Sequence, residues 1–187
     1  KAQWEKKNIK GAELSKKTLG IVGFGNVGVR LSYLVKGFNM EILVSSKSLE
    51  SRKKDYPHVK NVSFDELISK SDIIRFHCKA AADGKPLITK EHYKKIKPTT
   101  YIINAARGNI VDEKDLNEAL NENLIAGAAV DVFSKEPAKE NILFNNPKAV
   151  LTPHIAASTT EASIVVAEMI ANQISDFLLN GVKKNTV

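Results

Sequence analysis

The stretch Thr18-Leu19-Gly20-Ile21-Val22-Gly23-Phe24-Gly25-Asn26-Val27-Gly28 decides the fold. Its first five residues form an apolar run that is typical of a buried strand, and a helical pattern follows from Asn26. The glycines Gly23, Gly25 and Gly28 mark the turn between them. In such a turn the first glycine permits the bend and the second lets a pyrophosphate approach the backbone. The third allows close helix–strand packing, and the helix start offers amides and partial positive charge to phosphates.

Residues 23–28 also fit a glycine-rich turn that binds no ligand. The rest of the sequence is needed to distinguish a phosphate-binding turn from such a turn. Outward from it, short apolar runs alternate with helical patterns, which is typical of βα units in a parallel sheet. Further strands are expected over residues 42–44, 72–74, 101–103, 126–130 and 149–151. The sequence therefore predicts an α/β fold with a Rossmann-type doubly wound parallel sheet, as a single domain over residues 1–187.

Capping residues mark several helix boundaries. Residues 63–66 and 158–161 each have the Ser-x-x-Glu pattern of a capping box. Thr89 and Asp112 are expected to cap two shorter helices, and Gly181 to end the longest one. The first helix is expected to bury an apolar face made of Val27, Leu31, Leu34, Val35 and Phe38. The longest helix is expected to bury Ala162, Val165, Val166, Met169, Ile170, Ile174 and Phe177.

Composition limits the class of protein. With 43% hydrophobic and 26% charged residues in 187, the chain has an ordinary globular composition. No run approaches the ~18 apolar residues of a membrane span, so no membrane partner is expected. Cys78 is the only cysteine, which excludes an internal disulfide and fits a reducing compartment, the cytoplasm. We interpret Cys78 as a buried, inert thiol. The start Lys1-Ala2-Gln3-Trp4 lacks an initiator Met and a signal core, which indicates an excised or mature piece.

The net charge of +7 raises the question of a nucleic-acid partner. The lysines are spread over the chain and alternate with acids, as in residues 112–115, and no basic-aromatic motif is present. We interpret the charge as a solvated surface and expect neither a nucleic-acid partner nor a metal site. One local excess of positive charge remains, over residues 47–54.

The adenosine end of a dinucleotide site usually has an acid about twenty residues beyond the glycines, where it holds the ribose hydroxyls. Here the second strand ends in Val44-Ser45-Ser46-Lys47, so Ser46 stands where the acid is expected. Ser46 with Lys47 and Arg52 suits a 2′-phosphate, which needs hydroxyl and cationic donors. Alternatively, Ser46 contacts the ribose of NAD. The expected cofactor is therefore NAD, with NADP left open.

Arg107, Glu136 and His154 each stand in a polar stretch that follows an expected strand, at the edge where open α/β sheets bind ligands. Arg107 can bind a carboxylate or polarise a carbonyl through its planar guanidinium. His154 can take a hydroxyl proton as hydride leaves the carbon. Glu136 can hydrogen-bond the imidazole, fix its tautomer and favour its protonated form. Taken singly, each residue also fits a surface or turn position with no catalytic role. Together they indicate hydride transfer to or from a 2-hydroxy acid.

The chain resembles the nucleotide-binding domain of the D-isomer-specific 2-hydroxyacid dehydrogenases. The likeness covers nearly the whole chain and rests on residues 11–14, 20–28, 72–74 with His77, 104–113, 130–137 and 151–155. Residues 154–162 most resemble the members that oxidise 3-phosphoglycerate, and Asn180, Gly181 and Val187 fit those members too.

The resemblance implies a role for each matched residue. Arg107, Glu136 and His154 correspond to the catalytic set. The residues expected along the cofactor are Gly23, Gly25, Asn26, Val27, Gly28, Ser46, His77, Ala105, Ala106, Arg107, Asp131, His154, Ile155, Ala156 and Ala157. Among them, Asp131 corresponds to the residue that holds the nicotinamide carboxamide. The resemblance also implies a homodimer whose main contact lies in this domain.

Three departures from the family pattern matter. Ser46 replaces the usual acid, and residues 79–84 replace a proline- and threonine-containing loop. The family's substrate-binding lobe is absent from this chain, so the chain is expected to bind cofactor yet be catalytically incomplete.

The implied activity is NAD(P)-dependent oxidation of a D-2-hydroxy acid, with 3-phosphoglycerate of serine biosynthesis as the expected substrate. A glyoxylate or hydroxypyruvate reductase is the alternative enzyme. A non-catalytic dinucleotide-sensing interaction module is the alternative of a different class. The presence together of Arg107, Glu136 and His154 argues against that module, because a sensor does not need all three.

Overall fold

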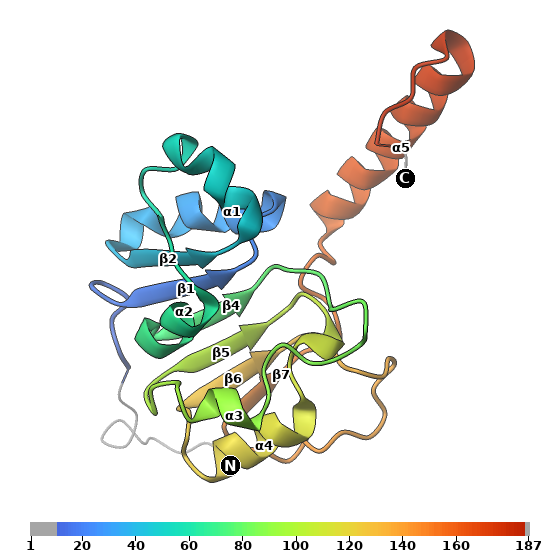
Figure 1. The fold of residues 1–187 in the computed structure, drawn as a ribbon. Helices are drawn as coiled ribbons and strands as arrows, with labels where there is room; N and C mark the ends of the chain where they lie inside the picture. The colour runs from blue at the N-terminus through green and yellow to red at the C-terminus, as the bar shows by residue number, and fades with distance from the viewer. Residues whose placement is uncertain (1–10, 186–187) are drawn as a thin grey trace.

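The strand predicted before the glycines, β1 (Thr18–Val22), lies inside a seven-stranded parallel sheet in the computed structural model, which describes residues 11–185 (Figure 1). The strand order is β3-β2-β1-β4-β5-β6-β7. The other strands are β2 (Glu41–Ser45), β3 (Lys60–Asn61), β4 (Ile73–Phe76), β5 (Tyr101–Asn104), β6 (Gly127–Val130) and β7 (Ala149–Leu151). The order reverses direction between β1 and β4, which is where doubly wound sheets bind ligands. The predicted doubly wound sheet is confirmed.

The register brings the carboxyl ends of six strands level. Val22 lies opposite Ser45 and Phe76, Phe76 opposite Asn104, Asn104 opposite Val130, and Val130 opposite Leu151. The residues that follow these positions therefore stand in one row along the sheet edge. They are Ser46, Gly23, His77, Ala105, Asp131 and Thr152, and most of them belong to the predicted site.

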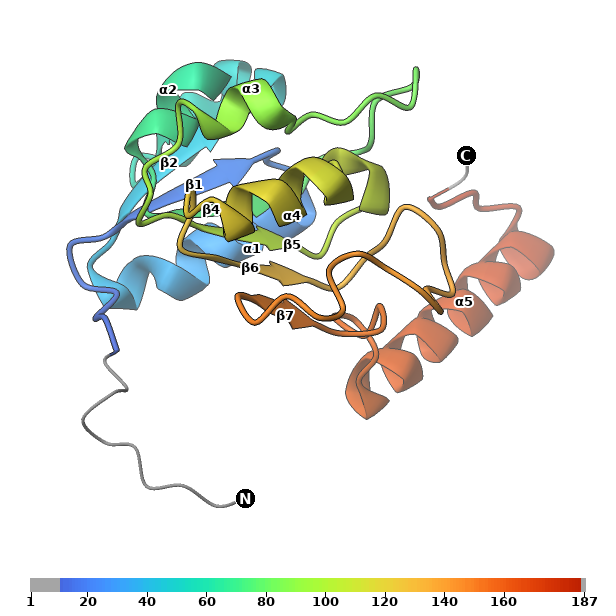
Figure 2. The same cartoon turned by 90° about the horizontal axis from the view of Figure 1, so that it is seen from below.

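Helices cover both faces of the sheet (Figure 2). On one face lie α2 (Phe64–Lys70), α3 (Lys90–Tyr93) and α4 (Glu113–Asn121), and on the other lie α1 (Asn26–Leu34) and its 3₁₀ continuation η1 (Val35–Phe38). Two further 3₁₀ segments are η2 (Lys47–Asp55) and η3 (Gly108–Ile110). The core splits in the same way. The larger cluster packs α2, α3 and α4 on the sheet through residues such as Leu67, Tyr93 and Leu116, and the smaller packs α1 and η2 on β1 and β2.

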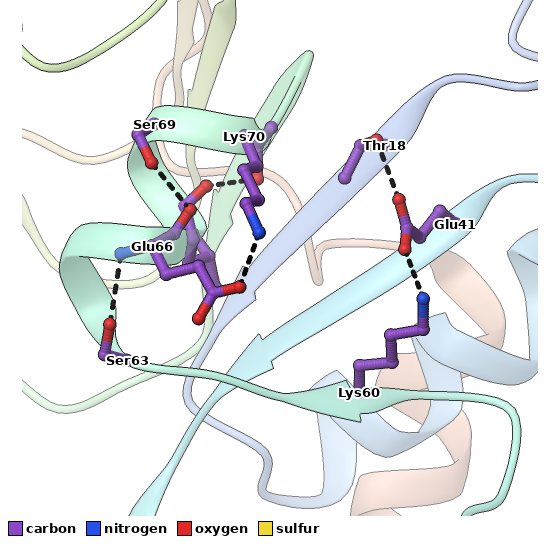
Figure 3. Close-up of polar contacts among 9 residues, drawn as sticks. Thr18, Glu41, Lys60, Ser63, Glu66, Ser69 and Lys70 are labelled. Carbon is purple, nitrogen blue, oxygen red and sulfur yellow. Dashed lines mark hydrogen bonds and ion pairs between the residues drawn. The ribbon is translucent and has the colours of Figure 1, made fainter.

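Most predicted helix boundaries are confirmed. The Ser63 hydroxyl accepts from the Glu66 amide at 3.2 Å, whereas the Glu66 carboxylate pairs with Lys70 instead of completing a capping box (Figure 3). Asp112 caps α4 by accepting from the Asp115 amide at 2.9 Å. Gly181 ends the last helix, α5 (Thr160–Asn180), in the left-handed conformation with φ 65°.

The start predicted for α5 is wrong by one residue. Thr159, and not Ser158, is the N-cap, and its hydroxyl accepts from the Ala162 amide at 3.0 Å. The capping box over residues 158–161 therefore does not form. Both residues carry a hydroxyl, so sequence pattern alone does not separate the two registers.

The predicted apolar face of the first helix is only partly buried. Leu31 and Val35 pack on the core, but Val27 and Leu34 are 63% and 62% exposed, and Phe38 is also exposed. The fully buried residues of the helix are instead two small ones, Gly28 and Ser32. A Cβ at Gly28 would stand 2.6 Å from the Gly23 carbonyl oxygen. The helix and the turn therefore approach each other closely, and the side of the helix that carries small residues is the buried one.

Helix α5 buries none of its residues among those that the structure describes, contrary to the prediction of a buried face. Figure 1 shows it projecting from the rest of the fold. Its length and mean hydropathy also meet the criterion for a membrane-crossing helix, although it holds no unbroken run of ~18 apolar residues. That criterion concerns length and composition alone. The expectation of no membrane partner therefore stays a prediction. The observation leaves α5 as a largely apolar helix without a partner in residues 11–185.

Candidate cofactor and active site

The glycine turn is built as a phosphate cradle. Gly23 has φ 91°, and a Cβ there would stand 2.7 Å from the His77 backbone. Around Gly25, by contrast, a Cβ would meet nothing within 4 Å, so the backbone is open on that side. Gly25 is also the N-cap of α1 and supplies no side-chain cap, and the Val29 amide makes the first bond back to it at 2.9 Å. The amides of the first helical turn therefore face outward without helical acceptors, which fits a pyrophosphate.

The end of β2 opens on a cavity of about 580 Å³. It is lined by Ser45, Ser46, Lys47, Glu50, Asn61 and Val62. Arg52, predicted to help bind a 2′-phosphate there, does not line it. Its guanidinium donates to the Tyr56 hydroxyl and lies 5.0 Å from the centroid of that ring.

A neighbouring cavity of about 470 Å³ lies between the ends of β1 and β2 and the loop after β4. Gly23, Ser46 and Lys47 line it together with Cys78 and residues of the divergent loop such as Asp83. Cys78 is half-buried and lines this cavity, so the prediction of a buried residue is only partly confirmed. Burial raises the pKa of its thiol, which agrees with its interpretation as an inert residue. Two adjoining cavities that share Ser46 and Lys47 thus follow the sheet edge, and their lining suits the adenosine half of a dinucleotide.

His77 stands at the end of β4, directly beside the glycine turn. Its backbone amide donates to the Val22 carbonyl at 2.7 Å. Burial, reinforced by the charge of Arg75, lowers the pKa of His77 to about 4, so the imidazole is neutral at neutral pH. Its Nε2 is buried without a hydrogen-bond partner among the described residues. An unpaired polar atom at this place fits a site that receives a polar ligand.

His154 and Glu136 meet at the sheet edge although eighteen residues separate them. The His154 Nδ1 lies 2.7 Å from the Glu136 Oε2, and the Glu136 Oε1 accepts from the Phe133 amide at 2.9 Å. The hydrogen bond with His154, followed by that with Phe133, lowers the pKa of Glu136, so its carboxylate is ionised at neutral pH. With Nδ1 engaged, the Nε2 of His154 is left to exchange a proton with a ligand.

Asp131 anchors the segment that carries His154. Its carboxylate accepts from the Thr152 hydroxyl at 2.5 Å and from the amides of Ile155 and Ala156, both at 2.9 Å. Burial alone would raise the pKa of Asp131, but these three bonds outweigh it and hold the pKa below its ordinary value. The structure thus shows Asp131 organising the backbone around His154. The role in holding a carboxamide that the resemblance implies remains a prediction.

Arg107 extends from the turn after β5, and its side chain is exposed. Its Nη1 donates to the Ala106 carbonyl at 2.6 Å, and it forms no ion pair within residues 11–185. The turn is held by Asn104, which is 2% exposed. The Asn104 amide nitrogen donates to the Arg107 carbonyl at 2.9 Å, and its oxygen accepts from the Ala106 amide at 3.2 Å. The guanidinium is therefore presented on a fixed turn, and its donors other than the one bound to Ala106 can meet an anion.

Two further cavities join the three predicted catalytic residues. Arg107 and Glu136 line one of about 270 Å³. Glu136 and His154 line another of about 580 Å³, whose other walls include Phe133, Phe144 and Leu151. Glu136 thus stands between an arginine on one side and the imidazole on the other. Such an arrangement can hold an anionic ligand and move a proton beside it.

Sequence reasoning placed the main site residues but missed several that support them. Asn104, Thr152 and Glu113 hold the turns that carry Arg107, His154 and Glu136, respectively. Glu113 accepts from the Ser134 amide at 2.7 Å and from Asn141 at 2.8 Å. Asn104 lay inside a stretch already identified, at a strand end where a buried amide is typical of turn support. Nothing in the sequence pattern pairs Glu113 with Ser134.

A doubly wound parallel sheet with an open glycine turn at its switch point defines a dinucleotide-binding domain. Comparison with known proteins identifies the family of dinucleotide-binding domains. Residues 1–156 match the family described as D-isomer specific 2-hydroxyacid dehydrogenase, NAD binding domain. The chain belongs to this family.

Individual relatives support the same assignment. The chain is 39% identical over 178 residues to a D-3-phosphoglycerate dehydrogenase of Synechocystis sp., covering 95% of this chain and 32% of that protein. It is 38% identical over 174 residues to a glyoxylate reductase of Pyrococcus furiosus, covering 93% and 52%. The crystal structure of a glyoxylate reductase from Paecilomyes thermophila matches with a TM-score of 0.85 and 33% identity, covering 97% of this chain and 55% of that one. The chain thus spans between a third and somewhat over half of the length of these relatives.

Proposed function

We propose that this chain is the cofactor-binding part of an NAD-dependent oxidoreductase that acts on a D-2-hydroxy acid. The observation that carries the proposal is the contact of 2.7 Å between His154 and Glu136 at the sheet edge, with Arg107 across the adjoining cavity. When bound, the nicotinamide supplies the hydride acceptor. His154 takes the proton of the substrate hydroxyl at Nε2, because Nδ1 is held by Glu136. Arg107 binds the substrate carboxylate through its free guanidinium.

For the substrate we propose 3-phosphoglycerate, oxidised to 3-phosphohydroxypyruvate. The support is the similarity to curated D-3-phosphoglycerate dehydrogenases at 35–39% identity. Similarity to glyoxylate reductases at 36–38% identity supports the reduction of glyoxylate or hydroxypyruvate as the alternative. The substrate-binding lobe would be supplied by sequence that flanks this domain. We further propose a cytoplasmic location and a homodimer, for which sedimentation at tens of micromolar is the direct measurement.

The test of cofactor binding is a titration of this chain with NADH, followed by nicotinamide fluorescence. The Gly25→Ala variant adds a methyl group where the fold has open space but where the pyrophosphate would approach. Its melting temperature should stay unchanged, while its NADH affinity should fall about tenfold or more, as for loss of a charge-assisted hydrogen bond. Gly37→Ala is the matched control, because Gly37 is equally open and lies in η1, away from the turn. Absence of saturable binding by the folded parent chain would overturn the proposal.

A further inference from the structure

The end of β2 lacks the acid that holds the adenosine ribose in most doubly wound domains. Ser46 stands in its place, yet the cavity that opens there contains a carboxylate all the same. Glu50, from the first turn of η2, lines the cavity together with Ser46, Lys47 and Asn61. Among the described residues that line this cavity, Glu50 is the one with an acidic side chain.

Glu50 is tied to the end of β2 through Asn61. The Asn61 Nδ2 donates to the Glu50 Oε2 at 2.8 Å, and the Asn61 Oδ1 accepts from the Ser46 amide at 3.4 Å. Lys53 donates to the other carboxylate oxygen, Oε1, at 2.6 Å. A carboxylate has about four acceptor positions, so two remain for the hydroxyl groups of a ligand.

The charge of this cavity favours a neutral ribose over a phosphate. The hydrogen bond from Lys53, then that from Asn61, lowers the pKa of Glu50, so the group is an anion at neutral pH. Of the two cations predicted to bind a 2′-phosphate, Lys47 and Arg52, the second donates to the Tyr56 hydroxyl instead. Lys53, from the same basic stretch, forms an ion pair with Glu50. Lys47 is left as the lining cation. A dianionic phosphate would therefore meet one lysine that is unpaired among the described residues, Lys47, and would lie beside the carboxylate of the Glu50–Lys53 ion pair.

We propose that Glu50 takes over the function of the missing acid, accepting the adenosine ribose hydroxyls and selecting NAD(H) against NADP(H). The inference rests on the proposed function, because it concerns the same dinucleotide. It replaces the interpretation of Ser46, Lys47 and Arg52 as a 2′-phosphate site. Ser46 then borders the ribose pocket, with its hydroxyl 3.0 Å from that of Ser48.

The experiment measures the dissociation constants of NADH and NADPH for this chain and for Glu50→Gln. The substitution keeps the size of the side chain and an acceptor oxygen but removes the charge. NADH should bind several-fold more weakly and NADPH several-fold more tightly, so that the ratio of the two constants changes about tenfold. Glu41→Gln is the matched control, since Glu41 is also paired with a lysine, Lys60, at 2.7 Å, but at the opposite end of β2 (Figure 3). The control should leave both constants unchanged.

The double variant Ser46→Asp/Glu50→Gln tests whether an acid at the usual position can replace Glu50. Restoring an acid at the usual position should restore the preference for NADH that Glu50→Gln loses. If Glu50→Gln is folded and changes the ratio by less than twofold, Glu50 is not the selector, although cofactor binding itself stands. A parent chain that prefers NADPH overturns the inference in the same way. A parent chain that binds neither cofactor overturns the proposed function as well.

Discussion

His154 adopts a left-handed backbone conformation with φ 55°, in the region that favours glycine. Non-glycine residues in this region are uncommon and persist only where the surroundings hold them. Here the support comes from both sides of the residue. Asp131 binds Thr152 before it and the amides of Ile155 and Ala156 after it. The backbone of His154 is thus fixed from both sides, while its side chain stays half exposed beside Glu136.

Replacement of His154 tests the acid–base assignment in the protein that also contains the substrate lobe. His154→Ala should lower turnover by roughly 10²–10⁴-fold, the usual contribution of a positioned acid–base group. NADH affinity should change little, because the imidazole meets the reacting hydroxyl rather than the adenosine half. Steady-state rates and a fluorescence titration separate the two quantities. His92→Ala, which removes a histidine from α3 on the face covered by α2 and α4, is the control. A His154→Ala variant that retains turnover within a few-fold of the parent would contradict the mechanism.

Asp131 gives a prediction about stability and pH. Its pKa is lowered in the folded state, so its contribution is present above the unfolded pKa, near 3.8, and is lost as pH falls through the folded value. Asp131→Asn should therefore reduce the free energy of unfolding at pH 7 by about 1–3 kcal/mol, the usual cost of leaving buried partners unsatisfied. At pH 3 the difference between parent and variant should shrink. Denaturant unfolding at the two pH values measures both, and an equal difference at both would refute the role of the charge.

At the scale of elements, the site depends on close contacts between turns. The turn after β5 and the loop after β6 touch at Gly108, where a Cβ would stand 1.9 Å from the Phe133 carbonyl oxygen and 2.5 Å from the Ser134 nitrogen. Glu113, at the start of α4, binds the same loop through Ser134 and Asn141. The positions of Arg107 and Glu136 relative to each other are set by this contact of backbone with backbone.

Gly108→Ala tests that contact. The added methyl cannot be accommodated by moving a flexible side chain, because the atoms that it meets are backbone. We expect a loss of stability of about 1–3 kcal/mol from overpacking, together with faster hydrogen exchange in residues 133–136. Gly84→Ala is a useful contrast for backbone strain, since Gly84 has φ 72° but open space around it. If Gly108→Ala melts like the parent and exchanges like it, the contact does not hold the loop.

Sequence patterns predicted where the helices and strands lie better than they predicted which helix faces are buried. The strand before the glycines, the helix start at Asn26 and the cap at Asp112 follow from local chemistry, and the structure confirms them. The exposed side of α1 could not be predicted from periodicity, because the close approach at Gly28 determines which side meets the sheet. In the site, strand ends located His154 and Glu136 because parallel strands share an edge. Glu50 could not be predicted as a site residue, because it is connected to Ser46 only through Asn61, which lies fifteen residues after Ser46.

At the scale of the whole molecule, α5 is expected to contribute little to the stability of the rest of the described chain. Removing residues 159–187 should change the melting temperature by less than about 2 °C, because no α5 residue is buried against residues 11–158. The truncated chain should also be more soluble, since it loses exposed apolar residues such as Ile170 and Leu179. Calorimetry of both chains measures the first effect. A large fall in melting temperature would show that α5 is packed in solution.

Helix α5 also has a mechanical consequence for the site. Its 21 residues span about 30 Å, so a swing of ten degrees at its base would carry its far end through about 5 Å. The clamp of Asp131 on Ile155 and Ala156 lies between that base and His154. The fulcrum of any such swing therefore falls after the clamp, within residues 157–159. A swing about these residues would leave the His154 backbone held by Asp131 and its imidazole beside Glu136.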